Sequence, residues 1–328
     1  MPTNLPPEYF RAEQVFREAE STSAKITALE EMMSTIPKHK GTDKLRAELR
    51  RKISKLKEDQ QKKKGAGKHE SEFHIEKEGA GRVVLVGSAN VGKSSILAAL
   101  THATPVISEA PFSTWTPLPG MMMIDDVQIQ LIDTPPLSKQ LAQPELFDLV
   151  RSADLILIVV DLLATPFQQL EDSLKLLNEH KILPKQREQQ TKDERRVQFI
   201  PMLVIVNKDD DNQSDDDFAV FKNLLEIKLP LVQISVTVKR NFENLKIRIF
   251  ESLEIIRIYS KPPGKDAELT KPFVIKKGST VEEFAGKVHH DFQQKLKSAR
   301  VWGSNVFDGQ LVGKDHILQD KDIVELHL

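Results

Sequence analysis

A glycine-rich segment at residues 87–95 constrains the fold of this chain more than any other feature. It reads GSANVGKSS and matches the pattern G-x-x-x-x-G-K-[ST]. The apolar run 82–86 precedes it, and the segment 95–100, rich in helix-forming residues, follows it. This order of buried strand, glycine loop and helix predicts a loop whose backbone N–H groups surround an anion at a helix N-terminus. A Gly-Lys-Ser turn that binds nothing is the alternative, and the flanking segments disfavour it.

The residues of the loop have separate expected roles in mononucleotide binding. The Lys93 ammonium reaches the β and γ phosphates, and the Ser94 hydroxyl is a ligand for Mg²⁺. The loop and the first helical turn supply the other expected phosphate contacts, from Asn90, Val91, Gly92, Lys93, Ser94 and Ser95.

Length and composition limit what surrounds this loop. At 328 residues the chain is long enough for two or three domains, and its net charge of −1 hides a strong local asymmetry. Residues 38–68 carry 13 Lys and Arg against 4 acidic residues, whereas residues 209–217 carry 6 Asp and no base. The absence of cysteine excludes disulfides and thiolate metal sites and agrees with a reducing compartment.

Hydropathy gives no sign of a membrane protein. The longest apolar runs, 154–160 and 202–206, have the length of strands and are too short to span a bilayer. The N-terminal residues 1–8 are polar and contain proline, unlike a secretory signal. We therefore expect a cytoplasmic location and no membrane partner.

Residues 1–64 predict an α-helical hairpin. Two apolar stripes with helical spacing lie within them, formed by Ile26, Leu29, Met33 and Ile36 and by Leu45, Leu49, Ile53 and Leu56. Pro37 and Gly41 separate the two stripes. The second helix is basic on its outer face, which is equally typical of an arm that follows RNA phosphates and of an ordinary solvated face. Residues 65–81 are rich in Lys, Gly and Glu and predict a flexible linker.

Between residues 82 and 253, buried strands alternate with amphipathic segments, a pattern typical of a mostly parallel sheet covered on both faces. The expected strands are 82–86, 121–124, 127–132, 154–160, 199–206 and 231–235. Asp125 and Asp126 occupy a tight turn that would place an antiparallel hairpin at one edge of the sheet. The polar segment 185–196 predicts a solvated loop or a helix extension.

Residues 254–328 predict a separate β-β-α-β-β domain. Its expected elements are strands at 255–259, 273–275, 299–302 and 323–326, with one helix at 281–297. His289 and His290 are adjacent on that helix and do not share a face, so we expect no metal site there.

The sequence N-K-D-D at the end of the strand 199–206 indicates which base is bound. The Asp210 carboxylate can accept from the ring N1–H and the exocyclic amine of guanine, a pair of donors that adenine does not offer. We expect Asn207 and Lys208 to brace this loop and lie along the base. Ser235 and Val236, at the end of the next strand, stand where a backbone N–H can meet the guanine oxygen. The following residues 211–217 are interpreted as an acidic, solvated loop.

Two further segments fit a sensor of the γ-phosphate. Residues 132–136 read IDTPP, and Asp133 is placed to hold a Mg²⁺-bound water. Residues 111–117 read PFSTWTP and offer a hydroxyl that completes the metal shell. Each motif is weak alone, but their order on successive strands makes a chance assembly improbable.

These motifs resemble those of translation-factor-class GTPases of the Obg and developmentally regulated GTP-binding (DRG) group, over nearly the whole chain. The family segment P-F-T-T-L is similar to residues 111–115, which implies that Thr114 rather than Thr116 binds Mg²⁺. Residues 23–32 and 45–56 are similar to the DRG-type helical region.

The C-terminal residues 301–303 and 312–322 look like a TGS domain, a ubiquitin-like β-grasp module. The resemblance thus implies an α/β protein that binds GTP or GDP with Mg²⁺ and hydrolyses GTP, with Lys93, Thr114 and Asp133 serving catalysis. It also implies association with the ribosome or structured RNA and allows a regulatory protein partner, and we expect no DNA partner.

The chain departs from the family pattern at the phosphate site. Pro136 replaces the glycine of D-x-x-G and has no N–H to donate. Leu137 stands where many GTPases have a water-orienting Gln, so we expect slow intrinsic hydrolysis. Asn90 resembles the residue found in K⁺-stimulated GTPases and is a candidate K⁺ ligand. The alternative function is a scaffold that binds GTP or GDP, hardly hydrolyses GTP, and acts through its basic arm and TGS domain.

Overall fold

The computed structural model describes most of the chain and divides it into two compact units, Met1–Ser71 and Glu72–Leu328. The described residues are 11, 14–16, 22–36, 49–54, 73–103, 116–138, 143–188, 197–225 and 228–328. No helix in these ranges is long and apolar enough to cross a membrane.

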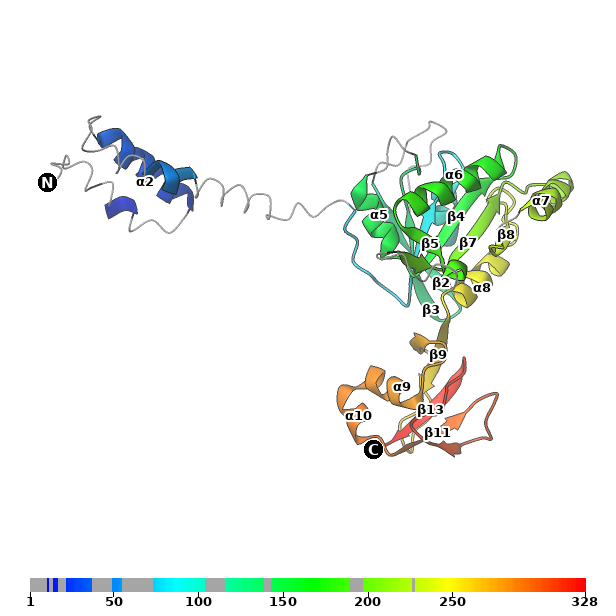
Figure 1. Cartoon of the computed structure of the whole chain (residues 1–328). Coiled ribbons are helices and arrows are strands. Elements are labelled where there is room, and N and C mark those ends of the chain that lie inside the picture. Colours follow the sequence, from blue (N-terminus) through cyan, green and yellow to red (C-terminus); the bar gives the residue numbers. More distant parts are fainter. Residues whose placement is uncertain are drawn as a thin grey trace. The chain divides into compact units, whose positions relative to one another are not determined.

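The N-terminal unit is helical in its described part. Helix α2 spans Thr22–Thr35, and residues 49–54 are also helical (Figure 1). A small buried cluster is formed by Leu29, Met32, Ile36, Leu49 and Ile53. This packing agrees with the predicted pairing of two amphipathic helices. Leu45 and Leu56 of the predicted second stripe lie outside the described residues.

The larger unit contains a six-stranded sheet in the order β2-β3-β1-β4-β7-β8. Its strands are β1 (Arg82–Val86), β2 (Leu118–Ile124), β3 (Val127–Asp133), β4 (Leu155–Asp161), β7 (Met202–Asn207) and β8 (Leu231–Gln233). All neighbours are parallel except β2 and β3, which form a hairpin whose turn is Asp125 and Asp126. The prediction of a mostly parallel sheet with one antiparallel edge is confirmed.

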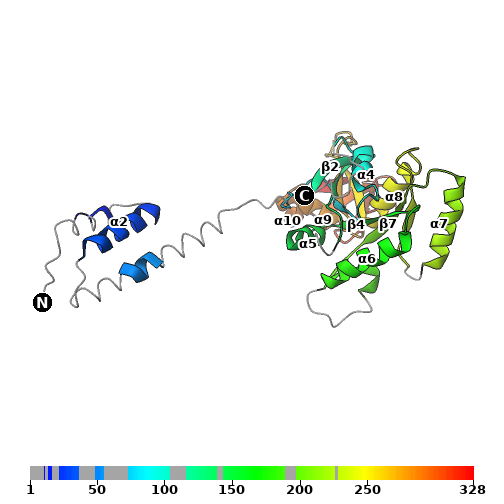
Figure 2. The same cartoon turned by 90° about the horizontal axis from the view of Figure 1, so that it is seen from above.

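Helices cover both faces of this sheet (Figures 1 and 2). They are α4 (Lys93–Leu100), α5 (Pro144–Arg151), α6 (Pro166–Glu179), α7 (Asn212–Leu224) and α8 (Phe242–Ser252). Val84 and Ile156 point into a core shared with α5 and α6, whereas Val83 and Leu85 point into a core shared with α4 and α8. Successive strand residues therefore feed opposite cores, as the pleat requires.

The strands around Pro201 differ from the expected elements. The predicted strand 199–206 is two strands, β6 (Gln198–Ile200) and β7, because Pro201 between them has no N–H to pair. β6 pairs with a short strand that the sequence did not indicate, β5 (Ile182–Pro184), which is followed by the 3₁₀ turn Lys185–Arg187.

The expected linker 65–81 is not flexible throughout, since residues 73–81 pack on the sheet. Phe73 and Ile75 contact the apolar core that the sheet shares with α5 and α6. The Arg82 guanidinium donates to the Ile75 carbonyl at 2.5 Å, and Gly79 bridges to Ile129 of β3. Residues 65–72 lie outside the described part.

A second, five-stranded sheet has the order β10-β9-β13-β11-β12. Its strands are β9 (Ile255–Ser260), β10 (Phe273–Lys276), β11 (Ser298–Trp302), β12 (Gln310–Val312) and β13 (Asp322–His327). β9 and β13 are parallel and the other neighbours are antiparallel. Phe284 and Ala285 fill the core between this sheet and helix α9 (Val281–Val288). The short edge strand β12 was not predicted.

The predicted single helix 281–297 is two helices, α9 and α10 (His290–Lys295). His289 separates them because its backbone is extended, with φ −161° and ψ 138°. Its Nδ1 accepts a hydrogen bond from the Asp291 N–H at 3.2 Å and so caps the second helix.

Candidate nucleotide-binding site

The glycine loop joins β1 to α4 in the conformation that its two glycines allow. Gly87 has φ 147° and Gly92 has φ 95°. A Cβ atom at Gly87 would lie 2.4 Å from the Val159 carbonyl oxygen, and one at Gly92 would lie 2.3 Å from Asn207 Nδ2. Any larger residue would clash at both positions, so the loop conformation depends on glycine.

Lys93 is held inside this loop. Its side chain is buried, and its Nζ donates to the carbonyl oxygens of Gly87 at 3.0 Å and Ser88 at 2.7 Å. Burial lowers the pKa of Lys93 to about 8, and the neighbouring Asp133 partly opposes this shift. The ammonium is therefore a desolvated cation at the start of α4, where an anionic ligand would be attracted most strongly.

Ser94 and Asp133 form the part of the site that fits a divalent cation. The Ser94 hydroxyl donates to Asp133 Oδ2 at 2.5 Å, and the other carboxylate oxygen accepts no hydrogen bond within the described ranges. Burial raises the pKa of Asp133, while the Ser94 hydrogen bond and Lys93 act in the opposite direction. A buried carboxylate with a free oxygen beside a hydroxyl is the kind of donor set that Mg²⁺ prefers. The third expected ligand, Thr114, lies outside the described residues.

Three other residues expected at the phosphates lie along the same loop. Asn90 is exposed and has a left-handed backbone, with φ 60°. Val91 is buried, and Ser95 is half-buried in the first turn of α4. Left-handed backbone is tolerated better by Asn than by most residues, so this conformation agrees with an asparagine at position 90.

The N-K-D-D motif is tied to the glycine loop and to β4. Asn207 Nδ2 donates to the Val91 carbonyl at 2.9 Å, and Lys208 Nζ donates to Asp161 Oδ2 at 2.5 Å. Both motif residues end or follow β7, next to the carboxyl end of β4. Asn207 thus ties the end of β7 to the glycine loop, and Lys208 ties the next position to the end of β4.

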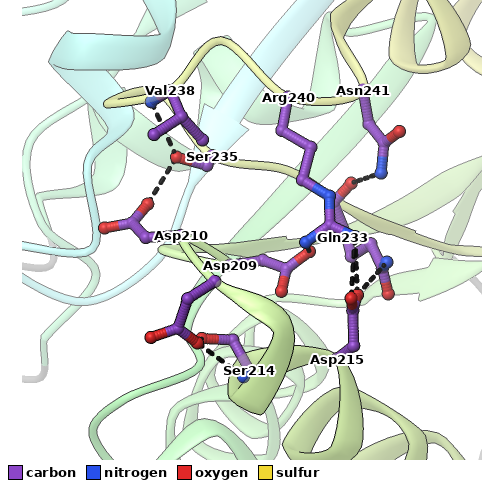
Figure 3. Close-up of polar contacts among 10 residues, drawn as sticks. Asp209, Asp210, Ser214, Asp215, Gln233, Ser235, Val238, Arg240 and Asn241 are labelled. Atoms are coloured by element: carbon purple, nitrogen blue, oxygen red, sulfur yellow. Dashed lines mark hydrogen bonds and ion pairs between the residues drawn. The ribbon is translucent and has the colours of Figure 1, made fainter.

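Asp210 points toward the loop that follows β8 (Figure 3). Its Oδ1 accepts a hydrogen bond from the Ser235 hydroxyl, which in turn accepts from the Val238 N–H at 3.1 Å. Asp210 is exposed, whereas Ser235 is buried and Val236 is half-buried. The two segments expected to hold the base are thus in direct contact.

The loop after Asp133 is anchored to β1 and the glycine loop. The Thr134 hydroxyl donates to the Leu85 carbonyl at 2.7 Å, and the Leu137 N–H donates to the Gly87 carbonyl at 3.0 Å. Pro136 is buried, and the Leu137 side chain packs into the apolar core. The chain thus has neither a side-chain amide at position 137 nor an N–H at position 136.

Sequence reasoning missed a charged cluster next to the N-K-D-D motif. Residues 211–217 are not the expected solvated loop, because α7 begins at Asn212 and Asp211 caps it by accepting from the Ser214 N–H at 2.9 Å. Asp215, in the first turn of α7, pairs with Arg240. The signal available was Asp211 in front of a helical apolar spacing, which is typical of an N-cap.

Comparison with known proteins agrees with this geometry. Residues 82–208 match the family model described as 50S ribosome-binding GTPase, and residues 256–328 match that of the TGS domain. An uncharacterized GTP-binding protein of Methanocaldococcus jannaschii is 30% identical over 362 residues, covering 92% of each chain. Developmentally-regulated GTP-binding protein 1 of Xenopus laevis is 28% identical over 93% of this chain and 98% of its own. The solved structure of the Schizosaccharomyces pombe YchF GTPase covers 77% of this chain and 99% of its own, at 13% identity and a TM-score of 0.51, and shares its fold.

Proposed function

Because this chain belongs to the family of DRG-like GTP-binding proteins, which join a P-loop GTPase domain to a TGS domain, we propose that it hydrolyses GTP slowly and acts on the ribosome or on structured RNA. The proposal of GTPase activity rests on two clusters of side chains that lie together at the carboxyl ends of the strands of the first sheet. Lys93, Ser94 and Asp133 form the first, and Asn207 and Asp210 belong to the second. The hydrogen bond from Asn207 to the glycine loop links them.

The chain's own residues have distinct proposed roles in binding and hydrolysis. The loop amides from Asn90 to Ser95 and the Lys93 ammonium bind the phosphates and balance the charge that grows on them during phosphoryl transfer. Ser94, Thr114 and, through a water, Asp133 would hold Mg²⁺, which would neutralise phosphate charge. Asp210 accepts from guanine, while the backbone at Ser235 and Val236 meets its oxygen.

Asn90 is the proposed K⁺ ligand. It lies in the glycine loop beside the expected α and β phosphates, and its exposed side chain carries an amide oxygen. A cation bound there would place positive charge near the phosphates, where position 137 has no side-chain amide and position 136 has no N–H. A cation held by Asn90 would thus replace part of the charge stabilisation that those two groups give in other GTPases.

We propose the domain boundaries 1–64 for the helical arm, 65–81 for the segment that links it to the next domain, 82–253 for the GTPase domain and 254–328 for the TGS domain. Within that linking segment, residues 73–81 pack on the first sheet. The arm is the proposed contact with RNA phosphates. In its described part, Arg50, Arg51 and Lys52 are exposed, whereas Leu49 and Ile53 are buried. The charged face is thus separate from the packed face, as such a contact requires. The proposed location is the cytoplasm, and a regulatory protein is a further proposed partner.

A second candidate function is a scaffold that binds GTP or GDP and barely hydrolyses GTP. The structural observation that favours it is the buried loop at Pro136 and Leu137, which presents no water-orienting amide. Both candidates use the same nucleotide site and differ in the rate of the chemical step.

Cosedimentation with purified ribosomes tests the proposed partner. The chain should pellet with ribosomes to different extents in GDP and in a non-hydrolysable GTP analogue. Lys93→Ala, which removes the phosphate-binding ammonium, should abolish the difference between nucleotides. The same pelleting in every nucleotide state, or none in any, would contradict a nucleotide-controlled ribosome contact.

A further inference from the structure

The third residue of the N-K-D-D motif is a buried carboxylate. Asp209 is 0% exposed, and its N–H donates to the Ile234 carbonyl at 3.1 Å, which ties the motif to the segment after β8. Neither of its carboxylate oxygens accepts a hydrogen bond within the described ranges. A carboxylate buried in this way is costly unless a cation compensates it, so its partner decides whether the loop is stable.

Arg240 is that partner, and it contacts three segments at once (Figure 3). Its Nη1 lies 3.1 Å from Asp209 Oδ2, and its Nη2 donates to both carboxylate oxygens of Asp215 at 2.7 and 2.9 Å. Its own N–H donates to the Ser235 carbonyl at 2.9 Å, which closes the loop 235–240. Through its guanidinium and its backbone N–H, Arg240 therefore joins the residues after β7, the first turn of α7 and the loop after β8.

Both ends of the Asp210–Ser235 contact lie next to this cluster. Asp210 follows Asp209 in the chain, and Ser235 exchanges backbone hydrogen bonds with Arg240. Gln233 Nε2 donates to Asp215 at 3.1 Å, and Asn241 Nδ2 donates to the Gln233 carbonyl at 3.1 Å, which extends the network around the same loop. Loss of the guanidinium would therefore alter the positions of both Asp210 and Ser235.

We propose that Arg240 is a positioning residue for guanine recognition, which holds the Asp210 carboxylate and the Ser235 loop at the separation that the base requires. The inference rests on the proposed function, in which Asp210 accepts from guanine. Arg240 does not touch the base in this account. It acts by compensating the buried Asp209 and by fixing two loops that come from different parts of the chain.

The test compares GDP with inosine diphosphate, which lacks the exocyclic amine that Asp210 accepts from. Arg240→Gln leaves Asp209 buried without a cation, so GDP affinity should fall by at least about tenfold and the preference for GDP over inosine diphosphate should shrink. In the double variant Asp209→Asn/Arg240→Gln, the buried charge is also removed, and most of the affinity and preference should return. Arg248→Gln is the matched control, because Arg248 is an exposed arginine of α8 that pairs only with Glu251 among the contacts the structure gives for its guanidinium.

Isothermal titration of each nucleotide and thermal unfolding of the nucleotide-free variants give the readouts. Loss of the GDP preference in Arg240→Gln, with recovery in the double variant and no change in Arg248→Gln, supports the proposal. An unchanged preference in Arg240→Gln, with or without a lower melting temperature, overturns it and leaves the ion pairs a structural role alone. Failure of the unaltered chain to prefer GDP over ADP would instead overturn the assignment of Asp210, and with it the proposed function.

Discussion

The Tyr259 hydroxyl donates a 2.6 Å hydrogen bond to Asp126 Oδ2 and thereby joins the two sheets of the larger unit. Asp126 lies in the turn between β2 and β3, and Tyr259 lies in β9. Beside this contact, Arg257 Nη1 donates to Asp125 Oδ2 at 2.7 Å, and its Nη2 donates to Asp320 Oδ2 at 2.7 Å. The turn that closes the hairpin of the GTPase domain is thus a polar contact with the TGS domain.

This junction predicts an unusual tyrosine titration. Burial raises the pKa of Tyr259 to about 12, and the hydrogen bond to Asp126 acts in the same direction. Since the folded state favours the neutral phenol, the contribution of Tyr259 to stability is complete below the ordinary pKa of 10.0 and is lost as pH rises toward about 12. Phenolate absorbance in a Tyr9→Phe variant, which leaves Tyr259 as the one tyrosine, should show a midpoint near 12.

Asp126→Asn, in the same Tyr9→Phe background, should lower this midpoint, because it removes a carboxylate that accepts from the phenol and disfavours the phenolate. Circular dichroism at each pH shows that the chain is still folded. A midpoint near 10 in the folded Tyr9→Phe protein would contradict the contact between the two sheets.

Asp210→Asn should exchange guanine for xanthine as the preferred base. The amide offers a donor to the xanthine oxygen at the place where the carboxylate accepted from the guanine amine. Titration with GDP and xanthosine diphosphate measures both affinities, and Asp216→Asn, an exposed aspartate in α7, is the matched control. If the Asp210 variant binds GDP as tightly as the parent and ignores the xanthine nucleotide, then Asp210 is not the base acceptor.

The amide oxygen of Asn90 should make GTP hydrolysis faster in K⁺ than in Na⁺ at equal ionic strength. Asn90→Gly is the appropriate variant, because position 90 has φ 60° and glycine adopts this backbone without strain. It should abolish the difference between the two salts while GDP binding persists. Asn90→Asp, which retains an oxygen at the same place, should keep a preference for K⁺. Equal rates of the parent in both salts would remove the potassium hypothesis.

Ribosome or RNA binding through the basic arm should weaken steeply with salt. Reversing Arg50, Arg51 and Lys52 to Glu should reduce the slope of log affinity against log salt by about one for each phosphate that the arm no longer neutralises. Reversing Lys246 and Arg248 in α8 is the control for a general charge effect. Affinity and slope that survive both the triple reversal and removal of residues 1–64 would show that this charge is only a solvated face.

The main sheet could be predicted because its central strands are buried on both faces and read as continuous apolar runs, such as Leu155–Asp161. Strand β12 could not, because three residues with an exposed Leu311 in the middle carry no period of their own. The break at His289 was missed because an imidazole that caps a helix looks, in sequence, like any helical residue. Whether such short segments form a strand or interrupt a helix depends on their packing against the rest of the fold.

Part of the candidate site could also be located from the sequence, and part could not. The glycine loop, Asp133 and the N-K-D-D motif could be found because each belongs to a short pattern of neighbouring residues. Arg240 was not found, because its partners Asp209 and Asp215 come from other segments and no short pattern joins them. These residues meet because the topology places β7 and β8 side by side. No pattern of neighbouring residues in the sequence indicates such a contact.

Single-turnover hydrolysis of GTP, with the chain in excess over nucleotide and with Mg²⁺ and K⁺ present, tests the central claim most directly. We expect slow conversion to GDP and phosphate by the chain alone, faster conversion with ribosomes, no cleavage of ATP, and no reaction in Lys93→Ala. GTP that is bound but stays intact with and without ribosomes would contradict a GTPase and favour the scaffold, and equal cleavage of ATP would contradict the assignment of the base site.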